Sequence, residues 1–201
     1  LVAFAMENDL WIISDEVYDR IVYEGPHVSF LGAGYDKVIM VQSFSKTFAM
    51  TGWRIGYILS PDLEAMGHIT KMQYYVTACS NDAMQYAVLE ALEKASDYPA
   101  MMRDEFKERR DLICARLNAM PGVSCHIPTG AFYVFPKIDV PGMNSEEVAM
   151  ALLDGGVLCS PGSAFGEAGE GHLRFAYTIG REGISRGMDR VEKVLAELRG
   201  D

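Results

Sequence analysis

Three short apolar runs, each next to a group of polar residues, constrain the fold of this chain most strongly. Leu10–Ile13 is followed by Ser14-Asp15-Glu16, Lys37–Val41 is followed by residues 42–46 (QSFSK), and Arg54–Leu59 is the third run. Short continuous apolar runs are typical of strands that are buried on both faces of a sheet. Open α/β sheets bind their ligands at the carboxyl ends of such strands. The sequence therefore predicts an α/β domain with a mostly parallel sheet and a functional site at the strand ends.

Segments with helical periodicity follow these strands. Ser60-Pro61 and Ser80-Asn81-Asp82 are typical helix starts, and Pro121-Gly122 is a helix stop after a third, long segment. Apolar residues recur on one side of each predicted helix. The three sets are Leu63, Met66 and Ile69; Met84, Val88 and Leu92; and Met102, Phe106, Ile113 and Leu117. Asp97-Tyr98-Pro99 marks a break, so we place a domain boundary there.

The remainder of the chain predicts a small α+β domain. Val123–Ile127, Ala131–Phe135 and Leu173–Tyr177 are strand candidates. Ser145 is the expected cap of a helix that has two glutamates in its first turn and ends at Gly155-Gly156. A final helix has an apolar stripe made of Ile184, Met188, Val191, Leu195 and Leu198. We expect residues 1–96 to be part of a large domain and residues 97–201 to be the small domain.

Composition excludes several classes of protein. A net charge of −10 and a pI of about 4.9 disfavour non-specific binding to nucleic acid. No apolar run approaches the roughly 20 residues that cross a bilayer, so we expect no membrane partner. The four cysteines are Cys79, Cys114, Cys125 and Cys159. They form no C-x-x-C pair, so no metal site is predicted, and we expect buried free thiols in the reducing cytoplasm.

Lys46 is the most informative single residue. It follows an apolar strand and lies close to Ser43, Ser45 and Arg54. Two hydroxyls and a guanidinium are suitable ligands for a phosphate, because Arg binds phosphate in bidentate fashion. A desolvated lysine beside such a site can lose its proton and attack an aldehyde. The alternative is an ordinary solvated lysine at the start of a helix.

Three more residues have two interpretations each. Asp15 ends a strand, where it either caps a turn or keeps a ring nitrogen protonated as a buried carboxylate. Tyr18 is either a core tyrosine or a hydrogen-bond donor to an oxygen of the same ring. Arg174 is either a surface arginine on a strand or a clamp for a carboxylate.

The ordered motifs resemble a known family. Residues 14–18 (SDEVY), 43–57 (SFSKTFAMTGWRIGY) and 173–177 (LRFAY) are similar to signature segments of the class I/II aminotransferases, the fold-type-I enzymes that depend on pyridoxal 5′-phosphate (PLP). Residues 128–133 and 160–166 resemble the branch that contains aspartate, alanine and aromatic aminotransferases. The resemblance covers essentially the whole chain, but only the C-terminal half of the family pattern.

The resemblance implies a role for each motif residue. Asp15 pairs with the pyridine nitrogen of PLP and Tyr18 with its ring oxygen, while Lys46 holds PLP as an aldimine. Ser43 and Arg54 bind the phosphate, Ser45 assists, and Arg174 binds the α-carboxylate of the substrate. The implied reaction moves an amino group from an amino acid to a 2-oxo acid, in a complete protein that is a homodimer.

The family pattern also has an N-terminal half with an Asn-Pro-Thr-Gly motif, and no Asn-Pro pair occurs here. We therefore expect a fragment with part of the PLP-binding large domain, inactive on its own. Two alternatives share these motifs. One is a PLP-dependent lyase or synthase of the same fold, and the other is the aminotransferase-like domain of a transcription regulator. The preferred side chain of the substrate does not follow from the sequence.

Overall fold

The computed structural model describes residues 1–200 and divides them into two compact units. The first unit is Leu1–Arg103, and the second begins at Asp104. This division lies inside helix α5 (Tyr98–Asn118), whereas the sequence places the boundary just before that helix. The helix therefore begins in one unit and continues into the other.

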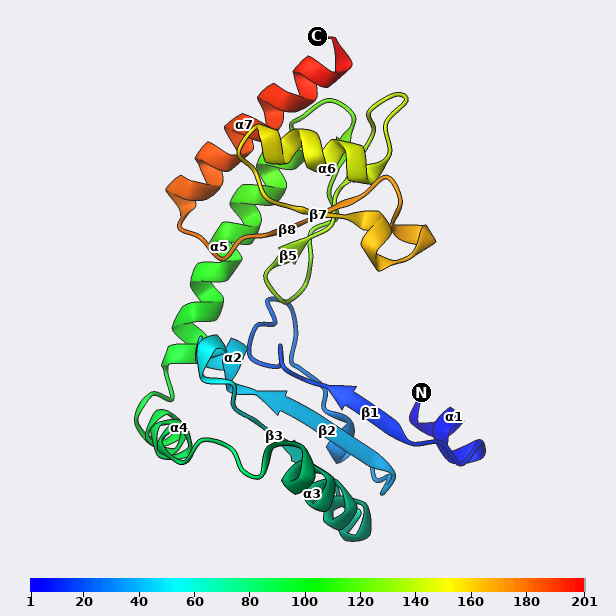
Figure 1. Ribbon diagram of the computed structural model, residues 1–201, viewed down its shortest axis with the longest axis vertical. Coiled ribbons are helices and arrows are strands. Elements are labelled where there is room, and N and C mark those ends of the chain that lie inside the picture. The colour runs from blue at the N-terminus through cyan, green and yellow to red at the C-terminus, as the bar shows by residue number, and fades with distance from the viewer. Residues whose placement is uncertain (201) are drawn as a thin grey trace. The chain divides into compact units, whose positions relative to one another are not determined.

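The first unit contains a three-stranded sheet with order β1-β2-β3 (Figure 1). Its strands are β1 (Ile12–Asp15), β2 (Val38–Ser43) and β3 (Gly56–Leu59). The helices are α1 (Val2–Glu7), α2 (Phe44–Thr47), α3 (Leu63–Thr77) and α4 (Asp82–Lys94). Two 3₁₀ turns, η1 (Phe30–Gly32) and η2 (Thr51–Trp53), complete the unit. The three strands and the α/β character agree with the sequence analysis.

The sheet is mixed. β1 pairs with β2 in parallel, whereas β3 runs antiparallel to β2. Ser43 at the end of β2 is paired with Gly56 at the start of β3, so the chain turns back immediately beside the strand that it has left. A parallel arrangement needs a longer crossover, usually through a full helix. The intervening segment has only α2 and η2, so the expected mostly parallel sheet is reduced to one parallel pair.

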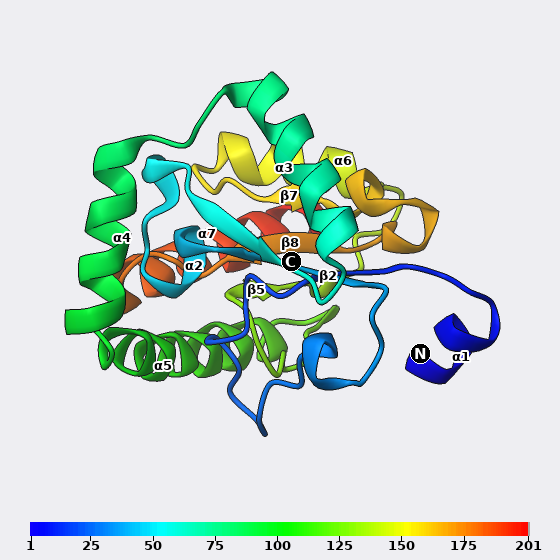
Figure 2. The same cartoon turned by 90° about the horizontal axis from the view of Figure 1, so that it is seen from below.

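Burial in the first unit differs from the sequence-based expectation. Ile13 is 73% exposed and Leu63 is 83% exposed, although both were expected to pack into a core. β1 is an edge strand with one buried position, and α3 has no buried residue although it passes across the sheet in Figure 2. The core of this unit is a small cluster instead. It consists of Phe44, Ile55 and Val88, with Phe48, Met50 and Met84 packed against it.

The second unit is the expected small α+β domain, with short antiparallel strands. β5 (Tyr133–Val134), β8 (Leu173–Ala176) and β7 (Ser160–Pro161) form one sheet, and β4 (Val123–Ser124) pairs with β6 (Lys137–Ile138). Helix α6 (Ser145–Asp154), helix α7 (Arg181–Arg199) and the turns η3 (Gly162–Phe165) and η4 (Glu167–Gly169) complete it. The stripes predicted on α5 and α7 are confirmed except at Met102 and Leu198, which are half-buried. The buried members are Phe106, Ile113, Leu117, Ile184, Met188, Val191 and Leu195.

Two expectations about individual residues are wrong. Asn144, and not Ser145, caps α6, because its side chain accepts hydrogen bonds from the backbone N–H groups of Glu146 and Glu147. Cys79 is exposed and Cys159 is only half-buried, so only Cys114 and Cys125 are buried thiols. Within residues 1–200, no helix is long and apolar enough to cross a membrane. The same residues bring no three His, Cys, Asp or Glu side chains together around a common metal position.

Candidate active site

The carboxyl ends of β1 and β2 lie at the same edge of the sheet. Asp15 is the last residue of β1 and is in register with Val41 of β2. Ser43 is the last residue of β2, and α2 follows it directly. The parallel pairing of these two strands therefore brings the Asp15 segment and the Lys46 segment to one edge.

Ser43 positions the one-turn helix that carries Lys46. Its Oγ accepts a hydrogen bond from the Ser45 N–H at 3.1 Å and thereby caps α2. The buried Ser45 is fixed from the other side, because its carbonyl oxygen accepts a bond from Thr51 Oγ1 at 3.0 Å. A short capped helix leaves little freedom for the backbone of Lys46.

Lys46 and Tyr18 meet at this edge. Lys46 Nζ lies over the ring of Tyr18, 5.7 Å from its centroid. Both side chains are half-buried. The structure thus joins two of the residues singled out in the sequence, from segments that follow different strands.

Arg54 has an unusual backbone. Its φ of 53° and ψ of 51° put it in the left-handed region, which a long side chain seldom adopts. Strained residues of this kind cluster at functional sites. The exposed guanidinium donates from Nη1 to the carbonyl oxygen of Thr51 at 2.8 Å, and a guanidinium has five donors in all. Arg54 therefore retains donor capacity for an anion.

Asp15 is exposed and not buried as the sequence suggested. Its Oδ1 accepts a hydrogen bond from the Val17 N–H at 3.3 Å, which is the geometry of the turn-capping alternative. Strand alternation explains the exposure, because neighbouring side chains point to opposite faces. Ser14 and Glu16 are directed inward, so Asp15 is directed outward. Its role at a cofactor stays a prediction.

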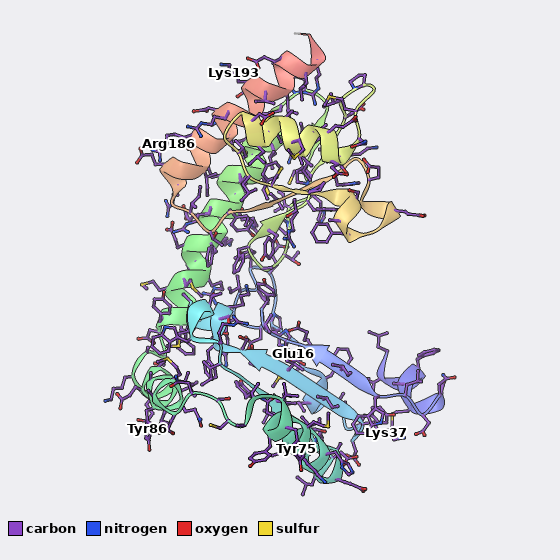
Figure 3. The ribbon with its side chains drawn as sticks, in the orientation of Figure 1. Glu16, Lys37, Tyr75, Tyr86, Arg186 and Lys193 are labelled. Atoms are coloured by element: carbon purple, nitrogen blue, oxygen red, sulfur yellow. The ribbon has the colours of Figure 1, made fainter. Side chains whose placement is uncertain are left out.

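Glu16 is a buried carboxylate that the sequence analysis did not single out (Figure 3). Its Oε1 accepts hydrogen bonds from Ser14 Oγ at 2.9 Å, Ser29 Oγ at 3.0 Å and the Phe30 N–H at 3.1 Å. Its Oε2 lies 2.8 Å from Nε2 of His27. Burial acts to raise the pKa of Glu16, but the bonds from His27, Ser29, Ser14 and Phe30 outweigh it and lower the pKa. Glu16 thus fixes residues 27–30 behind the Asp15 segment.

Gln42 links the Glu16 segment to the Lys46 segment. Gln42 Nε2 donates to the carbonyl oxygen of Glu16 at 2.9 Å, and Gln42 Oε1 accepts from the Ser43 N–H at 2.8 Å. Gln42 is buried, so these bonds are shielded from water. The two segments at the sheet edge are therefore held by a shared side chain.

Arg174, in the second unit, is neither a free surface residue nor an ion-pair partner of a carboxylate in residues 1–200. It lies on β8 with its guanidinium carbon 4.8 Å from the Tyr133 ring centroid and 4.6 Å from that of Phe165. Its Nη2 donates to Ser160 Oγ at 3.4 Å. Leu173 and Phe175 are buried on the opposite face. A half-buried guanidinium flanked by aromatic rings and lacking an internal carboxylate partner is suited to bind an external carboxylate.

A cavity of about 480 Å³ lies in the first unit. Of the predicted site residues, only Ser43 is on its wall, together with Asp19, Thr47, Phe48 and Tyr57. The side-chain atoms Asp19 Oδ1 and Thr47 Oγ1 are buried without a hydrogen-bond partner among the described residues. Asp15 and Arg54 are exposed and do not line this cavity, so Ser43 is the residue that the predicted site shares with it.

The residues at the sheet edge fit the ligand chemistry that their sequence pattern indicates. Arg54 offers an exposed guanidinium to a phosphate group, and Ser43 and Ser45 are hydroxyl residues beside it. In this structure Ser43 Oγ donates to the Ile55 carbonyl oxygen at 3.4 Å, and Ser45 is buried. Lys46 offers an amine beside an aromatic phenol, and Asp15 offers a solvent-facing carboxylate. The first unit is thus an α/β unit with a lysine-centred candidate site at the edge of its sheet.

Comparisons with known proteins give the family. Residues 1–191 match Aminotransferase class I and II. The chain is 41% identical to aromatic-amino-acid aminotransferase 2 of Thermococcus litoralis, over 98% of this chain and 51% of that protein. It is 43% identical to aspartate aminotransferase of Pyrococcus abyssi, again over 98% and 51% of the two chains. The solved aromatic aminotransferase from Pyrococcus horikoshii superposes with a TM-score of 0.89 at 40% identity, covering 97% of this chain and 53% of that one.

The chain therefore belongs to the class I and II aminotransferase family, and the resemblance found in its motifs is confirmed. It spans about half the length of the relatives that it matches.

Proposed function

We propose that this chain is the lysine-bearing part of a PLP-dependent aminotransferase. The observation that carries the proposal is Lys46 Nζ over the Tyr18 ring, beyond the ends of the parallel strands β1 and β2. The substrates of the complete protein are an amino acid and a 2-oxo acid. In this proposal residues 1–96 belong to the large PLP-binding domain and residues 97–201 to the small domain.

Five residues at the sheet edge, besides Lys46, hold the cofactor in this proposal. Arg54 and Ser43 bind the phosphate, with Ser45 assisting, because a guanidinium fork and hydroxyls match phosphate oxygens. Tyr18 donates its phenol to the ring oxygen. Asp15 keeps the ring nitrogen protonated, and its solvent-facing position leaves one carboxylate oxygen available beyond the bond from Val17.

When bound, PLP supplies an electron sink that stabilises negative charge at the substrate Cα. Lys46 Nζ is the amine that anchors the cofactor, and it is also the base that moves a proton at the substrate carbon. Arg174 holds the substrate α-carboxylate and so orients the Cα–H bond. The buried pair Glu16 and Gln42 keeps the Asp15 and Ser43 segments in register, which maintains the alignment of these groups.

The similar proteins favour amino transfer over the two alternatives. The two relatives named above are aminotransferases of aromatic amino acids and of aspartate by name, and a further relative at 36% identity is named as a probable N-acetyl-LL-diaminopimelate aminotransferase. A lyase of the same fold would use the same cofactor residues, and a transcription regulator would need a separate DNA-binding module. We further propose a cytoplasmic homodimer for the complete protein, with neither a nucleic-acid nor a membrane partner.

The test is a single-turnover absorbance experiment with the complete protein, loaded with PLP and mixed with a panel of amino acids. An aminotransferase converts the cofactor to pyridoxamine phosphate and releases one equivalent of the 2-oxo acid. Ammonia released together with the oxo acid, with PLP regenerated, would assign the lyase alternative. A spectrum that no amino acid changes would contradict both.

A further inference from the structure

Two of the four thiols lie together in the core of the second unit. Cys114 Sγ and Cys125 Sγ are 3.9 Å apart. Cys114 is 2% exposed and lies on α5, and Cys125 is 7% exposed and follows β4. Neither residue takes part in the site proposed above.

The backbone of Cys125 is held against α5 by one side chain. Asn118 Oδ1 accepts from the Cys125 N–H at 2.8 Å, and Asn118 Nδ2 donates to the Cys125 carbonyl oxygen at 2.9 Å. Asn118 is one helical turn beyond Cys114, so both cysteines are anchored to the same helix. The approach of the two sulfur atoms is therefore built into the fold and does not depend on a flexible loop.

The surroundings make the two thiols unequal. A hydrogen bond from the Cys125 thiol lowers the pKa of Cys114 against the effect of burial, and the charge of Arg110 contributes to the lowering. The same contact and burial raise the pKa of Cys125. Arg110 is 4% exposed and is fixed by the Pro128 carbonyl oxygen at 3.0 Å. Either sulfur can be the donor of the contact between them, and Cys125 Sγ also donates to the His126 carbonyl oxygen at 3.5 Å. The lowered pKa favours thiolate character at Cys114, and a thiolate is the nucleophilic form of a cysteine.

We propose that Cys114 and Cys125 form a reversible intramolecular disulfide when a peroxide oxidises Cys114. The Cys114 sulfur attacks one oxygen of the peroxide, so that an S–O bond forms, the O–O bond breaks, and the leaving oxygen departs as water. The Cys125 sulfur then attacks the Cys114 sulfur. An S–S bond forms, the S–O bond breaks, and a second water leaves with the Cys125 proton. The two thiols are oxidised, and hydrogen peroxide is reduced to two molecules of water.

The geometry requires only a small movement. A disulfide has an S–S distance of about 2.0 Å, so the sulfur atoms must approach by about 2 Å from their separation of 3.9 Å. Rotation of the two side chains supplies such a movement without unfolding α5. Burial of both sulfur atoms disfavours large disulfide reagents, so the oxidant in this proposal is a molecule as small as hydrogen peroxide. Cys79 is exposed, so larger disulfide reagents can reach its thiol.

The experiment uses the complete protein that contains this chain, fully reduced and then exposed to hydrogen peroxide at neutral pH. After denaturation, the remaining thiols are alkylated and the chain is digested with trypsin. Cleavage at Arg110 and Arg116 puts Cys114 and Cys125 in different peptides, so a disulfide links two peptides. We expect two of the four thiols to escape alkylation and the mass of the oxidised chain to fall by two hydrogen atoms. The digest should contain a cross-link between these two peptides, and dithiothreitol should restore both free thiols.

The variants test the order of events. In Cys125→Ser, Cys114 should be oxidised to a sulfenic acid that a dimedone probe traps, whereas Cys114→Ser should leave Cys125 unlabelled. The matched control, Cys79→Ser combined with Cys159→Ser, should form the disulfide as the wild type does. Oxidation of Cys79 or Cys159 with both core thiols intact would overturn the proposal, and so would a cross-link that forms only in urea. The wild-type result does not depend on whether a variant folds.

Discussion

Replacing Glu16 tests whether the first unit depends on its buried carboxylate. Glu16 Oε1 accepts three hydrogen bonds, from Ser14, Ser29 and the Phe30 N–H, at 2.9–3.1 Å. In Glu16→Ala these donors lose their acceptor, and each buried donor left unpaired costs about 1–3 kcal/mol. Ser29 and Phe30 lie in a partly buried segment that water can reach, so we take the lower value for each donor. The expected loss of unfolding free energy is about 3 kcal/mol.

Glu16→Gln separates shape from charge. The amide oxygen can take the place of Oε1 and keep the three bonds, while its nitrogen faces His27. Bonds to a neutral acceptor are weaker than bonds to a charged acceptor, but in Glu16→Gln no donor is left unpaired, so we expect a smaller loss than in Glu16→Ala. The contribution of the carboxylate also depends on pH. Because the folded-state pKa is lowered, the stabilisation is present above the usual value of 4.5 and is lost as the pH falls through the folded-state pKa.

Urea unfolding followed by tryptophan fluorescence measures this unit selectively, since both tryptophans, Trp11 and Trp53, belong to it. Glu7→Ala is the matched control, because Glu7 is exposed in the same unit. The Glu16→Ala penalty should shrink as the pH falls below 4.5 and on through the lower folded-state pKa, where the wild-type carboxylate loses its charge. The reasoning fails if Glu16→Ala costs less than about 1 kcal/mol, or if Glu16→Gln costs as much as Glu16→Ala.

Three further predictions concern other carboxylates and Arg174. In the complete protein, Asp15→Asn keeps the acceptor for the Val17 N–H but removes the charge. Turnover should therefore fall about 10²-fold or more with PLP still bound. Normal turnover would mean that Asp15 only caps the turn. Arg174→Lys should lower kcat/KM about 10- to 150-fold for all amino acids alike, because a charge-assisted bond is worth about 1.5–3 kcal/mol. A loss confined to one class of substrate side chain would mean that Arg174 selects the side chain and does not bind the common carboxylate. The pKa of Glu105 is held to about 2, mainly by Arg181 and then Arg109. Between pH 4.5 and 2 the thermal midpoint of the second unit should therefore fall more steeply in the wild type than in Glu105→Gln, as circular dichroism would show.

Periodic features of the sequence predicted the second unit well. The stripes on α5 and α7 repeat with the helical period, and a helix that packs on a sheet buries its apolar stripe whatever the detailed topology. Phe106 and Val191 are therefore found in the core as expected. The strand ends were similarly predictable, because polar residues follow the apolar runs. Asp15 and Ser43 both lie at the edge that this pattern indicated.

Features that depend on distant partners were not predictable. The direction of β3 is set by how the chain turns after α2, and exposure of Ile13 depends on which elements cover β1. Apart from Ser14, the partners of Glu16 lie in residues 27–30, more than ten residues away, and have no period. One signal was available. Asp15 and Glu16 are adjacent in an extended segment, so one of the two carboxylates had to point inward. The proximity of Cys114 to Cys125 has no comparable sign in the sequence.

The most direct test of the account is the location of the cofactor on the chain. The complete protein would be loaded with PLP, reduced with borohydride to fix the cofactor on the amine that holds it, and digested for peptide mass spectrometry. The account predicts the pyridoxyl group on Lys46, and its loss in Lys46→Ala without a change in folding. Lys37 and Lys71 are the internal controls in the same unit, since Lys37 pairs with Asp9 and Lys71 is exposed on α3. A pyridoxyl group on either of them, with Lys46 unlabelled, would contradict the central claim.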